Sequence, residues 1–487
     1  MLKQLVTVIC GFILPRYMLM YYGSSVNGLV SSVSHYLGFI SLLELGIGPV
    51  IQANLYKPLA EKDDIQISKI VISSERFFRR IAFILVGYIL VLVFVFPRYI
   101  CQSYDTWFTA SLIIIIAIST FAQYYFGATY QLLLNAAQRS YIQLNLQTIT
   151  IILNTIFCII LIKIGVSVHV VKLTTALLFF IRPICQSIYV KKHYQINKEI
   201  QLEEEPIKQK WNGFAQHLAG TVCSGTDVMV LTLFSTLENV SVYTVYYNVT
   251  IGVTNLIITV ATGIDAVFGD MIAKGEQQRL KEMFRKIETI THFVVTVVFT
   301  VTAITIVPFI KVYTRGVNDS NYILPVFGCA IVFAYGMQAI RVPYARIINA
   351  AGKFKETQKG ALISAALNVV LTVALVYKIG LVGAAVGTFV AMFYHVVYFV
   401  VYLKKNIIYR SVWTFAKMCL IDVVIVVVSY LLCCTIVMGE VTYTSWAFMA
   451  AKVTAIVFGV ALAVNAVLQP KMIQHICGDL KNRLVRK

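Results

Sequence analysis

The chain has 487 residues, of which 59% are hydrophobic and only 13% are charged, and its mean hydropathy is +0.79. This composition excludes an ordinary soluble protein and indicates one that lies in a lipid bilayer. The net charge of +19 does not indicate a nucleic-acid partner, because the Lys and Arg residues fall in short loops rather than on one soluble face.

Long apolar runs predict about fourteen membrane-spanning helices, since a span needs roughly 20 apolar residues. The runs are too long and unbroken to be strands of a membrane barrel, so the sequence predicts an all-α integral membrane protein. The expected spans are 2–22, 35–52, 81–96, 107–126, 148–164, 170–189, 214–234, 245–264, 292–310, 323–339, 361–377, 381–402, 415–438 and 446–468.

Two stretches of the chain are near copies of each other. Asn135-Ala-Ala-Gln-Arg139, Lys163-Ile-Gly165 and Lys191-Lys192 recur about 214 residues later as Asn349-Ala-Ala-Gly-Lys353, Lys378-Ile-Gly380 and Lys404-Lys405. Many transporters are built from internal repeats of this kind. We therefore predict an N-lobe of six spans at 1–192, a connector at 193–212, a C-lobe of six spans at 213–405, and two further spans with a basic tail at 406–487.

The distribution of basic residues predicts the orientation. If the N-terminus is cytoplasmic, most Lys and Arg residues fall on inner segments, as the positive-inside rule requires. The exceptions on outer segments are Arg98, Lys163, Lys172, Lys311, Arg315 and Lys378. We expect both termini and the connector to be cytoplasmic. The outer loops are short, and none can fold into a catalytic domain.

The stretches 59–80 and 272–286 occupy matching places in the two copies. Apolar residues recur in them at helical spacing against charged ones, including Ile67, Ile70, Val71 and Phe78 in the first and Leu280, Phe284 and Ile287 in the second. The pattern predicts two amphipathic helices on the inner membrane face.

Charged residues within predicted spans are the strongest candidates for function, because each costs roughly 2.5 to 3.5 kcal/mol on insertion scales. Arg16 and Asp227 lie at matching places in the first spans of the two copies. They either face a groove between the lobes or form an ion pair that locks the lobes together. Arg182, which precedes Pro183, either meets a phosphate or extends to the inner surface.

Glu44 lies beside Gly46, Gly48 and Pro49, which loosen the helix and can free backbone carbonyls. Its carboxylate could take up a proton or a cation, or it could be a neutral, hydrogen-bonded Glu. Asn154 and Asn368 are copies of each other in mid-span, and are either substrate contacts or hydrogen-bonding groups between helices.

Motifs for enzymatic chemistry are missing from the sequence. There is no GxxxxGK[ST] phosphate loop, HExxH, GxSxG or CxxC pair, and no metal-like spacing of His residues. The sequence therefore predicts a pathway for cargo rather than an active site. We expect no enzyme activity, no cofactor and no metal.

Five motifs in the first half of the chain resemble the amino-terminal signature of bacterial oligosaccharide flippases. They are Leu14-Pro-Arg16, Tyr22-Gly23, Val26-Asn-Gly-Leu29, Leu42-Leu-Glu-Leu-Gly-Ile-Gly48 and Leu55-Tyr-Lys-Pro-Leu-Ala60. Five later motifs resemble the second half of the sequences in that family. They are Thr226-Asp-Val228, Val242-Tyr243, Arg341-Val-Pro343, Ala350-Ala-Gly-Lys-Phe354 and Gly380-Leu-Val-Gly383. These flippases form the polysaccharide-export branch of the multidrug, oligosaccharidyl-lipid and polysaccharide exporter superfamily. The likeness covers nearly the whole chain and is most specific around Glu44.

This resemblance implies two six-helix lobes around a central cavity plus two additional helices, with the lobes rocking to expose the cavity to each side in turn. It also implies a polyprenyl-pyrophosphate-linked oligosaccharide as cargo, moved from the inner to the outer leaflet of a bacterial plasma membrane for surface polysaccharide assembly. Arg16 fits the motif position of a cation that meets the pyrophosphate. Membrane lipids, and the polymerase and glycosyltransferases of the same pathway, are the other partners implied.

Two other functions remain open from the sequence. A proton- or sodium-coupled exporter of small molecules could have the same fold, with Glu44 and Asp227 serving the coupling ion. A membrane enzyme, such as a polysaccharide polymerase or glycosyltransferase, is disfavoured because the chain has neither long outer loops nor an acidic sugar-nucleotide motif.

Overall fold

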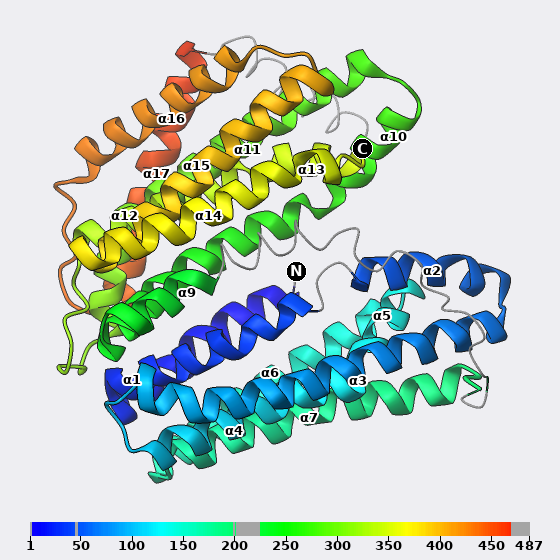
Figure 1. The fold of residues 1–487 in the computed structure, drawn as a ribbon. Helices are drawn as coiled ribbons and strands as arrows, with labels where there is room; N and C mark the ends of the chain where they lie inside the picture. The colour runs from blue at the N-terminus through cyan, green and yellow to red at the C-terminus, as the bar shows by residue number, and fades with distance from the viewer. Residues whose placement is uncertain (1, 44–46, 198–199, 201–224, 469–487) are drawn as a thin grey trace. The chain divides into compact units, whose positions relative to one another are not determined.

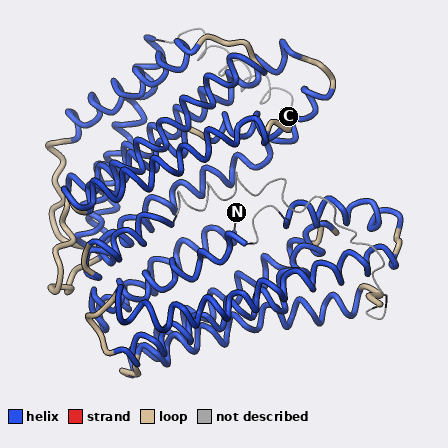
Figure 2. The backbone as a smooth tube through the Cα atoms, viewed as in Figure 1, coloured by secondary structure: helices blue, strands red, loops and turns tan. Residues whose placement is uncertain are grey.

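The computed structural model describes residues 2–43, 47–197, 200 and 225–468, and these residues form helices without any strand (Figure 2). Glu44, most of the predicted connector and the basic tail beyond residue 468 lie outside the described residues. The helices of the first half are α1 (Leu2–Gly38), α2 (Ile47–Glu61), α3 (Asp64–Val95), α4 (Thr106–Ala122), α5 (Ala128–Ala136), α6 (Ser140–Ile164) and α7 (Val168–His193).

The second half begins, within the described residues, with a short apolar helix at Gly225–Phe234. The longer helices that follow are α9 (Leu237–Val260), α10 (Ile264–Ala273), α11 (Gln277–Tyr313), α12 (Pro325–Ile340), α13 (Val342–Ala350), α14 (Phe354–Ile379), α15 (Leu381–Asn406), α16 (Val412–Cys433) and α17 (Tyr443–Leu468). Four short 3-10 or π-helical turns connect helices: Phe39–Leu43, Phe96–Ile100, Gln123–Gly127 and Ala261–Gly263.

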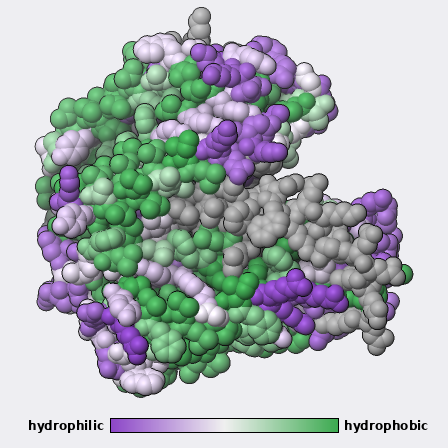
Figure 3. Space-filling model, viewed as in Figure 1, coloured by the Kyte–Doolittle hydropathy of each residue, from purple (hydrophilic) through white to green (hydrophobic). Residues whose placement is uncertain are grey.

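Twelve of the described helices are long and apolar enough to cross a membrane, which confirms the all-α, multi-pass fold class. The count differs from fourteen for two reasons. The first two predicted spans form one continuous stretch, Lys3–Leu42, and the first span of the second copy is described only at Gly225–Phe234. Hydrophobic side chains cover the long flanks of the helices, while hydrophilic ones gather mainly near helix ends (Figure 3).

Helix α1 consists of two helices that meet at a kink at Gly23, whose φ of 82° is in the left-handed region. The predicted loop between the first two spans is therefore helical. Its Ser- and Asn-rich sequence is typical of a turn, but Ser24, Asn27 and Ser32 are buried between helices. Ser24 donates from its backbone N and its Oγ to Asp319, both at 2.6 Å, and Ser32 and Thr232 share a hydrogen bond of 2.8 Å.

The stretches expected to be amphipathic surface helices are instead the first parts of long spanning helices. Residues 64–80 belong to α3 and residues 277–286 to α11. Their apolar faces are buried inside the protein, with Phe78 0% exposed and Phe284 2% exposed. The prediction of helices on the membrane surface was wrong, because the apolar stripe packs against neighbouring helices.

Backbone conformation repeats along the chain with the spacing of the sequence copies. Left-handed residues occur in pairs at Lys62 and Gly275, at Gln138 and Gly352, and at Gly165 and Gly380. Each pair is separated by about 214 residues, the repeat length seen in the sequence. Equivalent turns therefore recur in both copies, even where one copy lacks the glycine that favours this conformation.

The described helices form two compact units. The first unit comprises Met1–Thr244, Gly316–Ser320 and Ala361–Ala384, and the second comprises Val245–Arg315, Asn321–Gly360 and Ala385–Lys487. In the first unit α4 packs against α3 and α7, and α6 packs against α1 and α7 (Figure 1). In the second unit α11, α16 and α17 pack on one another around Ile425, Val453 and Val457. The predicted lobe boundaries at 192 and 213 stay a prediction.

Candidate functional site

A pocket of about 380 Å³ lies within the first unit, where α4 passes into the π-helical turn Gln123–Gly127. A π turn inserts an extra residue per turn and is frequent at functional sites, because it interrupts the regular helix wall. Helices α4, α5, α6 and α7 all contribute side chains to the pocket. The pocket is therefore formed by one copy of the repeat alone.

The pocket wall is mostly polar. Among the ten lining residues that the structure describes, one is charged, Arg182, and three are apolar: Ala128, Leu132 and Phe179. The remaining six carry hydroxyl or amide groups: Ser119, Thr120, Gln123, Tyr124, Gln131 and Gln147. Hydroxyls and amides both donate and accept hydrogen bonds, so this wall suits a ligand rich in oxygen atoms.

Glycine at position 127 allows helices to approach closely beside Arg182. A Cβ atom at Gly127 would lie 3.0 Å from Cβ of Pro183 and 3.1 Å from Oε1 of Gln123. Gln123 in turn donates to Gln131 at 2.9 Å, which fixes one wall of the pocket. Any larger residue at 127 would displace the pocket amides or the helix that carries Arg182.

The guanidinium group of Arg182 is fixed by contacts at its Nε and over its plane, whereas its Nη2 has no hydrogen-bond partner among the described residues. Its Nε donates to Oγ1 of Thr150 at 2.6 Å, and its Cζ lies 3.8 Å from the ring centroid of Phe179. Its Nη2 is buried and has no hydrogen-bond partner among the residues that the structure describes. Such a buried, charged donor is costly unless a ligand satisfies it, and an anionic oxygen is the group that would do so best.

The two predicted Asn residues lie away from this pocket. Asn154 of α6 is buried and accepts a bond of 3.2 Å from Sγ of Cys158, on its own helix. Asn368 is fully buried in α14. Neither side chain lines the pocket.

Arg16 and Asp227 also lie outside the pocket lining. Arg16 is half-buried in α1, directly after Pro15. Asp227 is 3% exposed and accepts hydrogen bonds from Tyr243 at 2.6 Å and from Thr372 at 3.3 Å. Hydroxyl donors thus stabilise the buried Asp227 carboxylate. Of the five candidate residues that the structure describes, only Arg182 lines the pocket.

A pair made of a Glu and a Tyr residue occurs at the same place in each copy, and the sequence reasoning missed it. Tyr130 donates to Glu75 at 2.8 Å, and Tyr344 donates to Glu288 at 2.6 Å. Residues 75 and 288 are 213 positions apart, and residues 130 and 344 are 214 apart. The repeat spacing could have revealed the pair, had it been searched for matching polar residues as well as matching motifs.

The second copy builds a larger polar cluster around its pair. Glu288, whose side chain is 0% exposed, binds both terminal nitrogens of Arg410, which precedes α16. His292 of α11 lies 3.2 Å from the Tyr344 hydroxyl and 2.6 Å from Oδ2 of Asp422, in the middle of α16. α16 and the segment before it are thereby joined to α11 and α13 through charged groups.

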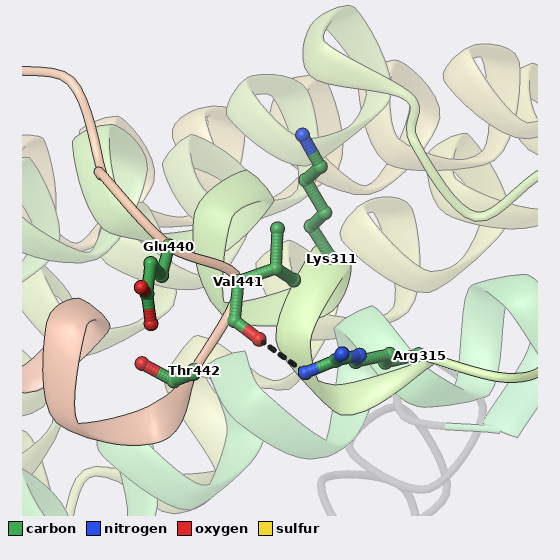
Figure 4. Close-up of a pocket in the computed structure, with 5 residues that line it drawn as sticks. All are labelled: Lys311, Arg315, Glu440, Val441 and Thr442. Carbon is green, nitrogen blue, oxygen red and sulfur yellow. Dashed lines mark hydrogen bonds between the residues drawn. The ribbon is translucent and has the colours of Figure 1, made fainter.

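A second hollow of about 500 Å³ lies in the second unit, lined by Lys311, Arg315, Glu440, Val441 and Thr442 (Figure 4). Arg315 points toward the carbonyl of Val441 and donates to it at 3.1 Å, whereas Lys311 points away. Both cations and Glu440 are exposed to solvent. This hollow lacks a buried polar group that would require a ligand, unlike the Arg182 pocket.

No protein-family model matches the chain, and no curated protein matches it. Several solved structures do match. The structure of the lipid II flippase MurJ in an inward closed conformation has a TM-score of 0.73 at 16% identity, over 97% of this chain and 99% of that chain.

Two multidrug transporters also match. An inward-facing multidrug resistance MATE family transporter of the MOP superfamily has a TM-score of 0.59 at 12% identity, over 82% of this chain and 96% of that one. A eukaryotic MATE transporter has a TM-score of 0.52 at 10% identity, over 93% and 98%. The chain is therefore a multi-pass membrane protein with the fold shared by these flippase and multidrug-transporter structures.

Proposed function

We propose that the protein is a flippase that moves a polyprenyl-pyrophosphate-linked oligosaccharide from the inner to the outer leaflet of a bacterial plasma membrane by alternating access. The single observation that carries this proposal is the buried Nη2 of Arg182, which has no hydrogen-bond partner among the described residues, in a polar pocket whose other described lining residues are uncharged. The likeness in fold to a lipid II flippase supports it.

The chemistry of the cargo explains why such a site is needed. A pyrophosphate carries two or so negative charges, and it loses its hydration on entering the hydrocarbon unless positive groups compensate. Arg keeps its charge when desolvated and offers a planar fork to phosphate oxygens. The stacking on Phe179 and the bond to Thr150 hold this fork in one orientation before any ligand arrives.

The pocket is small for the whole cargo. Ligand sites usually measure about 300 to 1,000 Å³, and this one is at the lower end. We therefore assign it to the phosphate and the first sugar, with the amides of Gln123, Gln131 and Gln147 meeting sugar hydroxyls. Arg16 remains our second candidate for the pyrophosphate, on its motif position alone.

A proton- or sodium-coupled exporter of small molecules is the alternative, and the likeness to multidrug transporters supports it equally at the level of fold. The two functions differ in what occupies the pocket. An exporter of cationic drugs would gain nothing from an unpartnered guanidinium group, whereas an anionic head group would. The Arg182 pocket therefore favours the flippase.

The test uses purified protein in liposomes that contain a fluorescent polyprenyl-pyrophosphate oligosaccharide, with no ATP added. Transfer between leaflets is measured by the access of an impermeant quencher. We expect Arg182→Gln to reduce the rate about a hundredfold, because a charge-assisted hydrogen bond contributes roughly 1.5 to 3 kcal/mol. Arg182→Lys should recover part of the rate, since Lys keeps the charge but not the fork.

Lys452→Gln is the matched control, because Lys452 is an exposed cation on α17. Its rate should equal that of the unaltered protein. Efflux of a cationic dye without any transfer of the lipid-linked sugar would support the exporter instead. A strict need for added ATP would contradict both functions.

A further inference from the structure

The polar cluster of the second unit, which the proposed function does not use, has a hydrogen-bond pattern that requires an additional proton. Asp422 accepts at both oxygens, from Thr296 at 2.7 Å and from His292 at 2.6 Å. An ionised carboxylate has no hydrogen to give, so Nδ1 of His292 must be the donor.

The other ring nitrogen is constrained as well. The single hydrogen of the Tyr344 hydroxyl is donated to Oε1 of Glu288 at 2.6 Å. Nε2 of His292 lies 3.2 Å from the same hydroxyl oxygen, which can then only accept. Nε2 must therefore carry a hydrogen too, and a histidine with hydrogens on both nitrogens is an imidazolium cation.

The charges of the cluster agree with this assignment. Glu288 and Asp422 contribute two negative charges, and Arg410 contributes one positive charge. With His292 protonated, the buried cluster is neutral; without that proton, it keeps one uncompensated negative charge at low exposure. Burying such a charge is costly, so the protonated form is the one that satisfies every group.

Within the part of the chain that the structure describes, the neighbouring elements supply no other group that could replace this proton. Cys419 and Asp422 face the cluster from α16, Tyr344 from α13, and Arg410 from the segment before α16. Asp265 and Asp270 of α10 are bound to Arg346 and Lys274. Among the described residues, α12 carries no charged side chain, and Lys452 of α17 is exposed.

The first copy lacks this titratable group. His292 lies 213 positions after Arg79, which pairs with Glu75 at 3.4 Å and keeps its charge at all physiological pH values. His is the side chain whose charge changes most readily near neutral pH. Replacing a permanent cation by a histidine makes the second copy alone sensitive to protons.

We propose that His292 is a proton-binding site, and that its bound proton strengthens the attachment of α16 to α11 and α13. Loss of the proton removes the donor toward Tyr344 or deprives Glu288 of one of its donors. Either change weakens the contact between α11 and α16 at Asp422. α16 is thus held more tightly at low pH than at high pH, independently of which cargo the protein moves.

The first test measures the proton itself. Protein labelled at the imidazole ring of His is studied by NMR in lipid nanodiscs, with His292→Gln to assign the signal. At about pH 7, we expect the imidazole ring of His292 to be doubly protonated. Asp422→Asn should neutralise His292 at this pH. A neutral His292 in the unaltered protein, or a signal unchanged by Asp422→Asn, would overturn the proposal.

The second test measures the attachment of α16 by hydrogen–deuterium exchange at about pH 6 and pH 8.5, after correction for the intrinsic rate. Peptides from Val412–Cys433 should exchange about tenfold faster at the higher pH, while those from Ser140–Ile164 should not change. In Asp422→Asn the fast rate should appear at both pH values. Equal α16 rates in the unaltered protein would refute the attachment. Because neither readout involves transport, both are independent of the proposed flippase activity.

Discussion

The side chain of Asn27 donates a hydrogen bond of 2.8 Å to Ser241, and the two residues are 214 positions apart, which is the repeat length of the chain. The bond therefore joins the two copies of the repeat through residues at equivalent positions. Both residues are buried, so this hydrogen bond lies in the interior of the first unit and not on its surface.

Removing this bond should reveal a modest but specific coupling. In a double-mutant cycle, Asn27→Ala and Ser241→Ala should show a coupling free energy of about 0.6 kcal/mol, typical of hydrogen bonds between helices in membranes. The measurement is unfolding in a denaturing detergent. Asn54 is exposed and bonds only its own helix at Val50, so a cycle of Asn54→Ala with Ser241→Ala should give no coupling.

Gly28→Ala should be severely destabilising. A Cβ atom at Gly28 would lie 1.9 Å from the carbonyl oxygen of Leu237, a backbone atom that cannot rotate away. We expect loss of folded protein, judged by size-exclusion profile and melting temperature, because overpacking of this kind costs about 1 to 3 kcal/mol or more. Gly11→Ala, in the same helix with nothing within 4 Å, is the control and should fold normally. Equal effects of the two changes would argue against this helix contact.

The two copies should respond differently to loss of their arginines. Arg410→Ala leaves the fully buried Glu288 without its guanidinium partner and should cost about 3 to 5 kcal/mol. Arg79→Ala breaks a pair whose Arg side chain is 46% exposed and should cost less than about 1 kcal/mol. Thermal unfolding of both variants tests this. Adding Glu288→Gln to Arg410→Ala should recover much of the loss; no recovery would mean that Arg410 acts through packing.

The orientation of the chain can be tested at the two ends of neighbouring helices. Lys163 ends α6 on the predicted outer side, and Lys192 ends α7 on the predicted inner side. In a cysteine-free background, an impermeant maleimide should label Lys163→Cys in intact cells and Lys192→Cys only after lysis. Labelling of Lys192→Cys in intact cells would reverse the predicted direction of transport.

Composition and repeat spacing were sufficient to predict the fold class, because apolar length and duplicated turns are local properties. They also placed Arg182 among the candidates, since a charge inside an apolar run is visible without any structure. The same local reasoning misread the Ser- and Asn-rich stretch after Gly23, whose side chains bond distant residues such as Asp319 and Thr232. It also took the apolar face of 64–80 for a membrane surface, although protein covers it.

The Glu288 cluster could not be predicted in this way. Arg410 and Asp422 reach α11 from segments 122 and 130 residues later in the chain, and no periodicity indicates such pairings. Only the comparison of the two copies gives a clue: position 292 holds a histidine where the first copy has an arginine, so the charge that Glu288 needs has to come from elsewhere.

This division of charges has a consequence for biosynthesis. The first copy neutralises Glu75 with Arg79, one helical turn away, as soon as α3 leaves the ribosome. Glu288 has no guanidinium of its own until Arg410 has been translated. A nascent chain that stops before Arg410 therefore holds the Glu288 carboxylate with Tyr344 as a donor but without a guanidinium partner. Charge compensation of Glu288 by a guanidinium group therefore has to wait until translation has passed residue 410.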